Sequence, residues 1–180
     1  MRPNLSALFA ALALTPFSAS AKLAVKGTPD VHFFATGPGG LTIDGKTADL
    51  TVADDGTKAV FTVALKKLET GIALRDEHTR KKYLQVDTYP DATLELLRGD
   101  VKLPEPGKRG EGEVKGTYTC HGKSQPVTVK YKIRRDKDGL DVDGRFKINI
   151  KDHGIDVPSY LGVTVRPEME IQVKFQATDG

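Results

Sequence analysis

The chain has 180 residues, 38% of them hydrophobic, and carries 27 Lys and Arg against 24 Asp and Glu. That length is enough for one domain with a sizeable core. The nearly balanced charge argues against a nucleic-acid-binding protein, which needs a strongly basic face. A single cysteine cannot form an internal disulfide, so the core must be stable without one.

The first residues have the features of a secretory signal peptide. Arg2 gives a positive start, an apolar run covers residues 5–14, and residues 19–21 form a small-x-small cleavage pattern. The apolar run is about half as long as a membrane-spanning helix, which needs about 20 residues. We therefore predict that residues 1–21 are removed and that residues 22–180 form one domain, periplasmic or secreted, with no transmembrane span.

The first half of this domain predicts strands. Residues 22–34 predict a strand that is interrupted at Gly27-Thr28-Pro29, where strand propensity is low. Residues 41–52 and 58–68 predict a hairpin around Asp54-Asp55-Gly56, because a short Gly-containing turn separates two runs rich in apolar residues.

Residues 73–84 differ from the rest, because they contain helix formers and few β-branched residues. We predict one short polar helix there. It must end before Pro90, since proline cannot continue a helix and favours an extended conformation at Tyr89.

From Pro90 onward, apolar and polar residues alternate. Because successive side chains of a strand point to opposite faces, each alternating run predicts an antiparallel strand with one buried face. Together with the early strands this gives about eight, which is typical of a barrel or sandwich. The runs are residues 92–96, 114–120, 127–133, 140–150 and 169–177.

An outer-membrane barrel would show the same alternation with its apolar face toward lipid. However, the sequence lacks tryptophan for interfacial girdles, and its Lys and Arg residues are distributed along the whole polar face. These features favour a water-soluble protein with the apolar face inward. The predicted fold class is therefore all-β with one short helix, as an eight-stranded antiparallel β-barrel.

A barrel of eight strands either fills with its own side chains or holds a ligand. Gly116 and Gly144 fall on inward-facing positions, where glycine leaves room beside the backbone. They are equally consistent with a bulged or coiled strand that leaves no cavity. An open apolar cavity and a self-filled barrel therefore both remain open.

Signals for catalysis are weak. His32, His78, His121 and His153 show no metal-ligand spacing, and the sequence contains no HExxH motif, nucleophile elbow or phosphate-binding loop. We predict no enzyme activity, no metal and no cofactor; a metal-dependent enzyme is the less favoured alternative. We interpret Cys120 as a small buried hydrophobic residue.

Two groups of polar residues are candidates for binding the head group of an amphiphile. One group lies on the predicted helix, and the other follows the strand at 140–150. If both converge at a cavity mouth, they would hold a polar head whose tail lies inside. The alternative is a solvated helix face and an ordinary strand end. The candidate head-group residues are Asp76, His78, Arg80, Lys151, Asp152, His153 and Tyr160.

An ordered set of short motifs resembles the YceI-like domain. The set is fairly specific and spans nearly the whole mature chain, although each motif alone is weak. The arginine and aromatic residue usual near the last motif are replaced by Lys151 or Asn149 and by His153. The motifs are Asp76-x-His78, Lys82-Tyr83-Leu84-x-x-Asp87-x-Tyr89-Pro90, His121-Gly122-x-x-x-Pro126-Val127 and Asp152-x-Gly154-Ile155.

The resemblance implies an exported, lipocalin-like eight-stranded barrel whose apolar tunnel binds an isoprenoid quinone, another polyisoprenoid or a similar amphiphile. Members are often dimers, so a homodimer is a candidate assembly. We predict a carrier or scavenger of such a lipid; the alternative is a non-catalytic stress-response or structural module of the cell envelope. The predicted tunnel residues are Phe61, Val63, Leu94, Val129, Tyr131, Val142, Phe146, Ile148, Ile171 and Val173.

Overall fold

The computed structural model describes residues 22–160 and 163–179, so the predicted signal peptide lies outside the described residues. The strands are β1 (Leu23–Thr36), β2 (Thr42–Thr47), β3 (Leu50–Asp54), β4 (Lys58–Ala64), β5 (Asp91–Leu97), β6 (Arg109–Cys120), β7 (Lys123–Asp136), β8 (Gly139–Asn149), β9 (Ser159–Tyr160), β10 (Val163–Thr164) and β11 (Glu168–Asp179). The helical segments are η1 (Pro38–Gly40), η2 (Leu65–Lys67), α1 (Ala73–Glu77), η3 (His78–Tyr83), η4 (Arg98–Asp100) and η5 (Ile150–His153).

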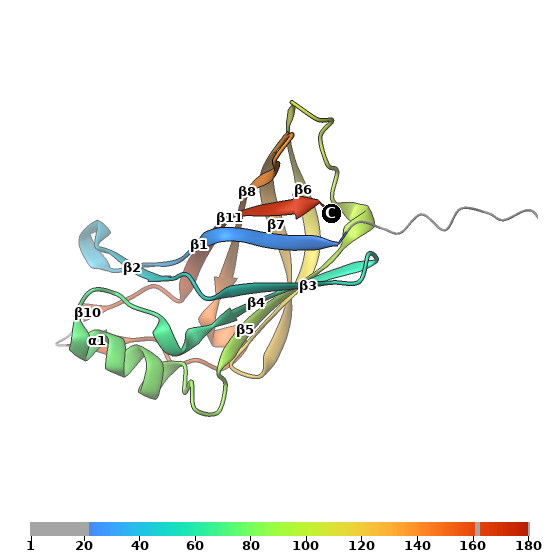
Figure 1. The fold of residues 1–180 in the computed structure, drawn as a ribbon. Coiled ribbons are helices and arrows are strands. Elements are labelled where there is room, and N and C mark those ends of the chain that lie inside the picture. The colour runs from blue at the N-terminus through green and yellow to red at the C-terminus, as the bar shows by residue number, and fades with distance from the viewer. Residues whose placement is uncertain (1–21, 161–162, 180) are drawn as a thin grey trace, which may run out of the picture.

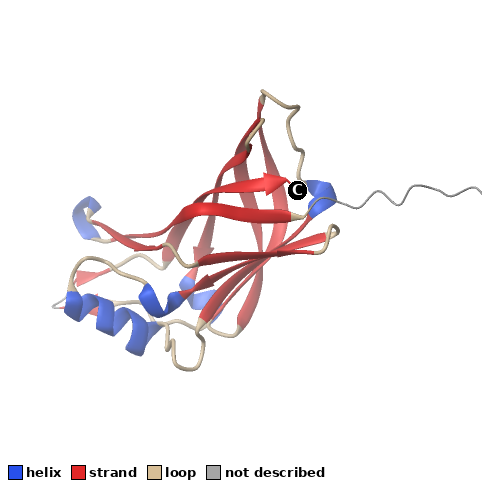
Figure 2. Cartoon of the chain, viewed as in Figure 1, coloured by secondary structure: helices blue, strands red, loops and turns tan. Residues whose placement is uncertain are grey.

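Nine of the described strands form one antiparallel sheet, in the order β2-β1-β11-β8-β7-β6-β5-β4-β3. The sheet curls into a nearly closed barrel, with α1 at one end and the yellow-green η4 near the opposite end (Figure 1). Figure 2 shows that the helical segments lie toward the ends, while the walls consist of strands. The predicted fold class, an antiparallel barrel with one short helix, is confirmed.

The strand count differs from eight because residues 41–52 do not form a single strand. The chain bends at Ala48, whose carbonyl accepts a hydrogen bond from the Leu50 N–H at 3.0 Å. Before this bend β2 pairs with β1, and after it β3 pairs with β4. Two successive strands therefore form the two edges of the sheet, and together they correspond to one kinked strand of an eight-stranded barrel.

A groove remains where the first part of β1 faces β3. The predicted interruption of β1 is present as a register shift between Lys26 and Asp30, with Gly27 at φ 66°. Pro29 has no backbone N–H to offer a neighbouring strand. Among the described residues no backbone ladder joins β1 to β3, and the groove between them has a volume of about 700 Å³. The barrel wall is thus interrupted along this seam.

The inward faces of the strands form the core. Val31, Leu65 and Ile171 have exposed fractions of 0%, 1% and 2%. Cys120 is a free, buried thiol, in agreement with its interpretation as a small hydrophobic residue. The alternation of apolar and polar residues therefore identified the buried face of the strands correctly.

The predicted helix is present, as α1 continued by η3, and it ends well before Pro90. The η3 segment is π-helical, a rare form in which each bond spans one more residue than in an α-helix. Arg80 donates from Nη1 to the Leu68 carbonyl at 2.7 Å, which ties the helix to the segment after β4. Among the described residues, no helix is both long and apolar enough to cross a membrane.

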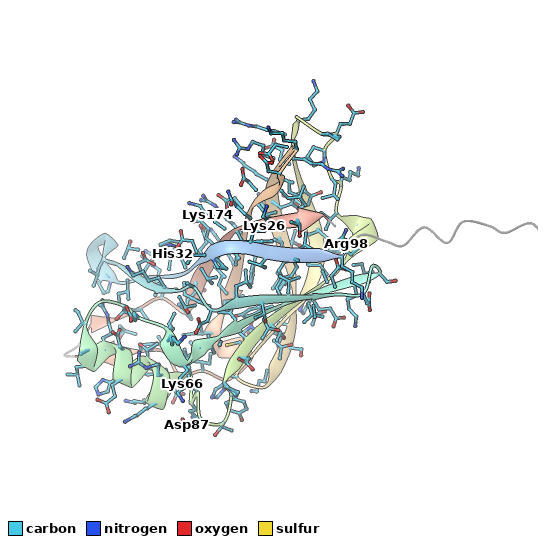
Figure 3. All side chains as sticks on the ribbon, in the orientation of Figure 1. Lys26, His32, Lys66, Asp87, Arg98 and Lys174 are labelled. Atoms are coloured by element: carbon cyan, nitrogen blue, oxygen red, sulfur yellow. The ribbon has the colours of Figure 1, made fainter. Side chains whose placement is uncertain are left out.

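One surface histidine connects β1 to β2 through two carboxylates. His32, labelled on β1 in Figure 3, lies 2.7 Å from Asp44 through Nδ1 and 2.7 Å from Asp30 through Nε2. The hydrogen bond with Asp44, opposed by partial burial, raises the pKa of His32 above 6.5. In the protonated ring both nitrogens donate, so the folded state favours the charged form.

We therefore expect the stability contribution of His32 to be complete below pH 6.5 and to be lost as the pH rises through the raised pKa. The free energy of unfolding of the wild type and of His32→Gln is measured with denaturant at pH 5.5 and pH 9. The difference in this free energy between the two proteins should be smaller at pH 9. His78→Gln, at an exposed position, serves as the control. An equal difference at both pH values would contradict the assignment.

Candidate ligand-binding site

An apolar cavity of about 120 Å³ lies inside the barrel, with walls from β1, β3 to β8 and β11. Nine of the ten predicted tunnel residues line it; Ile148 is buried but does not. Their contact with a ligand stays a prediction. The nine are Phe61, Val63, Leu94, Val129, Tyr131, Val142, Phe146, Ile171 and Val173.

The cavity is smaller than most ligand pockets, which measure about 300–1,000 Å³. Large side chains fill the space beside two inward glycines: a Cβ on Gly116 would lie 2.4 Å from Leu96, and one on Gly112 would lie 2.6 Å from the Tyr131 hydroxyl. Gly144 differs, because a Cβ there would meet only Val129, at 3.6 Å. Of the two glycines singled out in the sequence, only Gly144 leaves open space in the cavity.

The described lining residues are most exposed at one end of the cavity. Leu103, in the β5–β6 connection, is 37% exposed and is the most accessible residue of the lining. At the other end the lining residues Tyr118 and Phe146 are 4% and 5% exposed, and His153 behind them is 1% exposed. We call these the Leu103 end and the Tyr118 end, and from these exposed fractions we take the first as the mouth and the second as the blind end.

Among the described residues of the lining, Arg98 is the single charged one, and it is held by a buried carboxylate. It forms an ion pair with Asp54, whose side chain has no exposed surface. Asp54 also accepts hydrogen bonds from the N–H groups of Leu23 at 2.7 Å and Gly56 at 2.8 Å. Figure 3 shows Arg98 at the barrel end away from α1. The mouth therefore carries a charged pair that is already satisfied.

The two tyrosines of the lining differ in their hydroxyls. Tyr131 accepts a hydrogen bond from the Lys102 N–H at 2.9 Å. The buried Tyr118 hydroxyl has no partner with hydrogen-bond geometry in the part of the chain that the structure describes. Burial, with a smaller contribution from Cys120, raises the pKa of Tyr118 well above its ordinary value, so the hydroxyl stays protonated.

The predicted head-group residues on the helix do not line the cavity. Asp76 is buried and accepts hydrogen bonds from the Thr70 N–H at 2.6 Å and from the Thr70 hydroxyl. Burial acts to raise the pKa of Asp76, but these hydrogen bonds and the nearby Arg80 outweigh it and hold that pKa below its ordinary value. Asp76 thus fixes the loop before α1, while His78 is exposed to solvent.

The second predicted group divides into outward and inward residues. Lys151 and Asp152 are exposed, and the side chain of Tyr160 lies outside the described part of the chain. His153 is buried, its Nδ1 lies 2.9 Å from the Lys123 carbonyl, and its ring stands edge-on to that of Tyr118 at 5.3 Å. His153 does not line the cavity, but its ring contacts Tyr118, which does.

The polar residues of the lining that sequence reasoning missed are Arg98 and Tyr118. Tyr118 carried a usable signal, because its phenol falls on the inward face of a strand whose other inward residues are apolar. Asp54 was interpreted only as part of a turn. Among the described residues no group of three or more His, Cys, Asp or Glu side chains is arranged to hold a metal ion.

Comparisons with solved structures support the fold. A polyisoprenoid binding domain from Saccharophagus degradans has a TM-score of 0.74 at 14% identity, covering 89% of this chain and 99% of its own. Burkholderia cenocepacia BcnA has a TM-score of 0.67 at 19% identity, covering 83% and 96%. A mutant CJ YCEI protein has a TM-score of 0.51 at 16% identity, covering 99% and 94%. At these identities the likeness establishes a shared fold.

A search of curated proteins finds no match. The model of the YceI-like domain, in contrast, matches residues 32–177, which include almost the whole barrel from β1 to β11. The motifs singled out in the sequence all fall within these residues. The chain belongs to the YceI-like domain family.

Proposed function

We propose that this protein binds a polyisoprenoid, such as an isoprenoid quinone, or a similar amphiphile inside its barrel and acts as its carrier or scavenger. The observation that carries the proposal is the cavity itself, whose lining is apolar except for Arg98 and the hydroxyls of Tyr118 and Tyr131. Each methylene buried there contributes about 0.8 kcal/mol before entropy costs. The polyisoprenoid binding named for the Saccharophagus degradans domain agrees with this chemistry.

The proposal includes export. The signal-peptide pattern of residues 1–21 supports a periplasmic or secreted location, where a barrel with an apolar interior would hold a lipid away from water. We also propose a homodimer as the assembly to be tested by light scattering. No catalytic step is assigned to the protein.

A self-filled barrel that serves as a structural or stress-response module is the competing function. It is favoured by the small cavity of about 120 Å³ and by the packing of Leu96 over Gly116. A prenyl chain would then enter only if side chains such as Leu96 change rotamer. The two functions differ in one measurable property, which is the retention of a lipid.

The test is to express the full chain with export, purify the mature protein without detergent and extract it with organic solvent for mass spectrometry. We expect a prenyl or other long-chain species close to one equivalent per chain. The extract is repeated after incubation with an isoprenoid quinone, to separate an empty protein from one that does not bind. No retained lipid in either extract would reject the carrier function and favour the self-filled module.

A further inference from the structure

Two buried polar atoms near the Tyr118 end have no hydrogen-bond partner among the described residues: the hydroxyl oxygen of Tyr118 and Nε2 of His121. Both residues contact His153. The Tyr118 ring stands edge-on to the His153 ring, and Nδ1 of His121 lies 3.3 Å from the His153 carbonyl oxygen. Buried polar groups are nearly always satisfied in folded proteins, and of these two atoms the Tyr118 hydroxyl belongs to a residue that lines the cavity, so it requires an explanation.

The described residues around Tyr118 give its hydroxyl no strong hydrogen-bond acceptor. Its ring packs edge-on against Phe146 with centroids 5.1 Å apart, and both residues line the cavity. The neighbouring polar group is the thiol of Cys120, which is buried and is a weak hydrogen-bonding group. The hydroxyl is therefore a donor without a good acceptor, at the wall of a mostly apolar cavity.

We propose that the Tyr118 hydroxyl donates a hydrogen bond to a carbonyl oxygen in the head of the ligand, so that the ligand is bound head first, with its apolar tail running to the mouth at Leu103. This inference rests on the proposed function and adds the orientation and the chemical class of the ligand. The class is an amphiphile with a carbonyl head, as in a quinone, a ketone or a carboxylic acid.

The opposite orientation leaves both ends of the cavity poorly matched. A tail at the blind end would bury the Tyr118 hydroxyl against methyl groups, which cannot accept its proton. A head at the mouth would meet Arg98, whose guanidinium is already paired with the buried Asp54. Head-first binding satisfies the hydroxyl and leaves that ion pair intact.

Head-first binding also predicts how affinity depends on the length of the tail. A tail that runs toward Leu103 can leave the mouth, so its outer units stay in water and add nothing to binding. Affinity should therefore rise with tail length and then reach a plateau. Tail-first binding would instead impose an upper limit, because Tyr118, Phe146 and His153 close the far end.

The test compares wild type, Tyr118→Phe and Tyr131→Phe with two probes, farnesylacetone and the hydrocarbon in which a methylene replaces its carbonyl. We expect Tyr118→Phe to bind the ketone about 5- to 10-fold more weakly and the hydrocarbon within about twofold of wild type. The free Tyr118→Phe protein should be at least as stable as wild type, because the substitution removes an unsatisfied group. Tyr131→Phe should affect both probes equally.

Infrared spectroscopy of farnesylacetone with a ¹³C-labelled carbonyl gives a second readout. The carbonyl band should shift to lower frequency in wild type, as expected for a hydrogen-bonded ketone, and not in Tyr118→Phe. Equal ketone affinity and an equal band position in the two proteins would overturn the orientation while leaving the proposed function standing. If wild type binds neither probe, both the orientation and the proposed function fail.

Discussion

Replacing Gly144 with leucine is expected to reduce ligand uptake at least about 10-fold while the barrel stays folded. Gly144 lies on β8 and lines the cavity, and a Cβ there would meet only the Val129 side chain, at 3.6 Å. A leucine therefore extends into the space that a lipid would occupy. Filling an apolar cavity commonly adds about 0.5–2 kcal/mol to the free energy of unfolding.

The measurement is the affinity for farnesylacetone together with urea unfolding of the ligand-free protein. Lys147→Leu is the matched control, because it places the same side chain on the exposed face of the same strand. The control should bind like wild type. If Gly144→Leu is folded and takes up the ketone normally, the ligand binds elsewhere, and the groove between β1 and β3 becomes the next site to test.

The sequence predicted the face of each strand well, because a period of two residues directly determines which side chains point inward. Nine of ten predicted tunnel residues line the cavity for this reason. The same pattern does not show how far along the barrel axis a side chain lies. Ile148 follows Phe146 on the same face of β8, yet it lies beyond the cavity, in the core near the blind end.

The bend between β2 and β3 was not predicted, because residues 41–52 were interpreted as a single strand. The two strands differ in the strand with which they pair: β2 pairs with β1, and β3 pairs with β4. Both pairings are hairpins between neighbouring strands, so the bend lies where the first hairpin ends and the second begins. The alternation therefore predicted one strand where the change of partner requires two, and it missed the seam that this bend creates.

Charged residues were the least predictable part of the site. Asp76, Lys151 and Asp152 were candidates because their charges cluster in the sequence, but Asp76 anchors a loop and the other two are exposed. Asp54 and Arg98 are 44 residues apart and each looks like an ordinary turn or strand-end residue. Burial of a charge depends on contacts between distant segments, which composition and spacing do not contain.

Replacing Asp54 with alanine is expected to cost about 3–5 kcal/mol of unfolding free energy, because it leaves the partly buried Arg98 guanidinium without its carboxylate partner. The substitution also removes the acceptor for the Leu23 N–H, the hydrogen bond that links the start of β1 to β3 across the seam. A loss of this size is a large part of the usual stability of a domain, about 5–15 kcal/mol.

Urea unfolding of Asp54→Ala, Arg98→Ala and the double variant separates the two effects as a double-mutant cycle. The coupling energy between the two sites should be strongly favourable, and Asp54→Asn, which keeps an acceptor for Leu23, should be less destabilised than Asp54→Ala. Lys67→Ala, which breaks an exposed ion pair with Asp49, should change stability little. Additive single effects would show that the pair does not act as a unit.

Hydrogen exchange identifies which part of the structure is destabilised in Asp54→Ala. If Asp54 holds the seam, the amide of Leu23 should exchange faster in Asp54→Ala than in wild type, while amides in the paired part of β1, such as Val31, keep their protection as long as the protein is folded. An opened seam would also join the groove to the cavity, since Leu23 and Leu50 line both. Faster lipid exchange by the folded variant would then identify the Asp54–Arg98 pair as the group that keeps the barrel closed along this side.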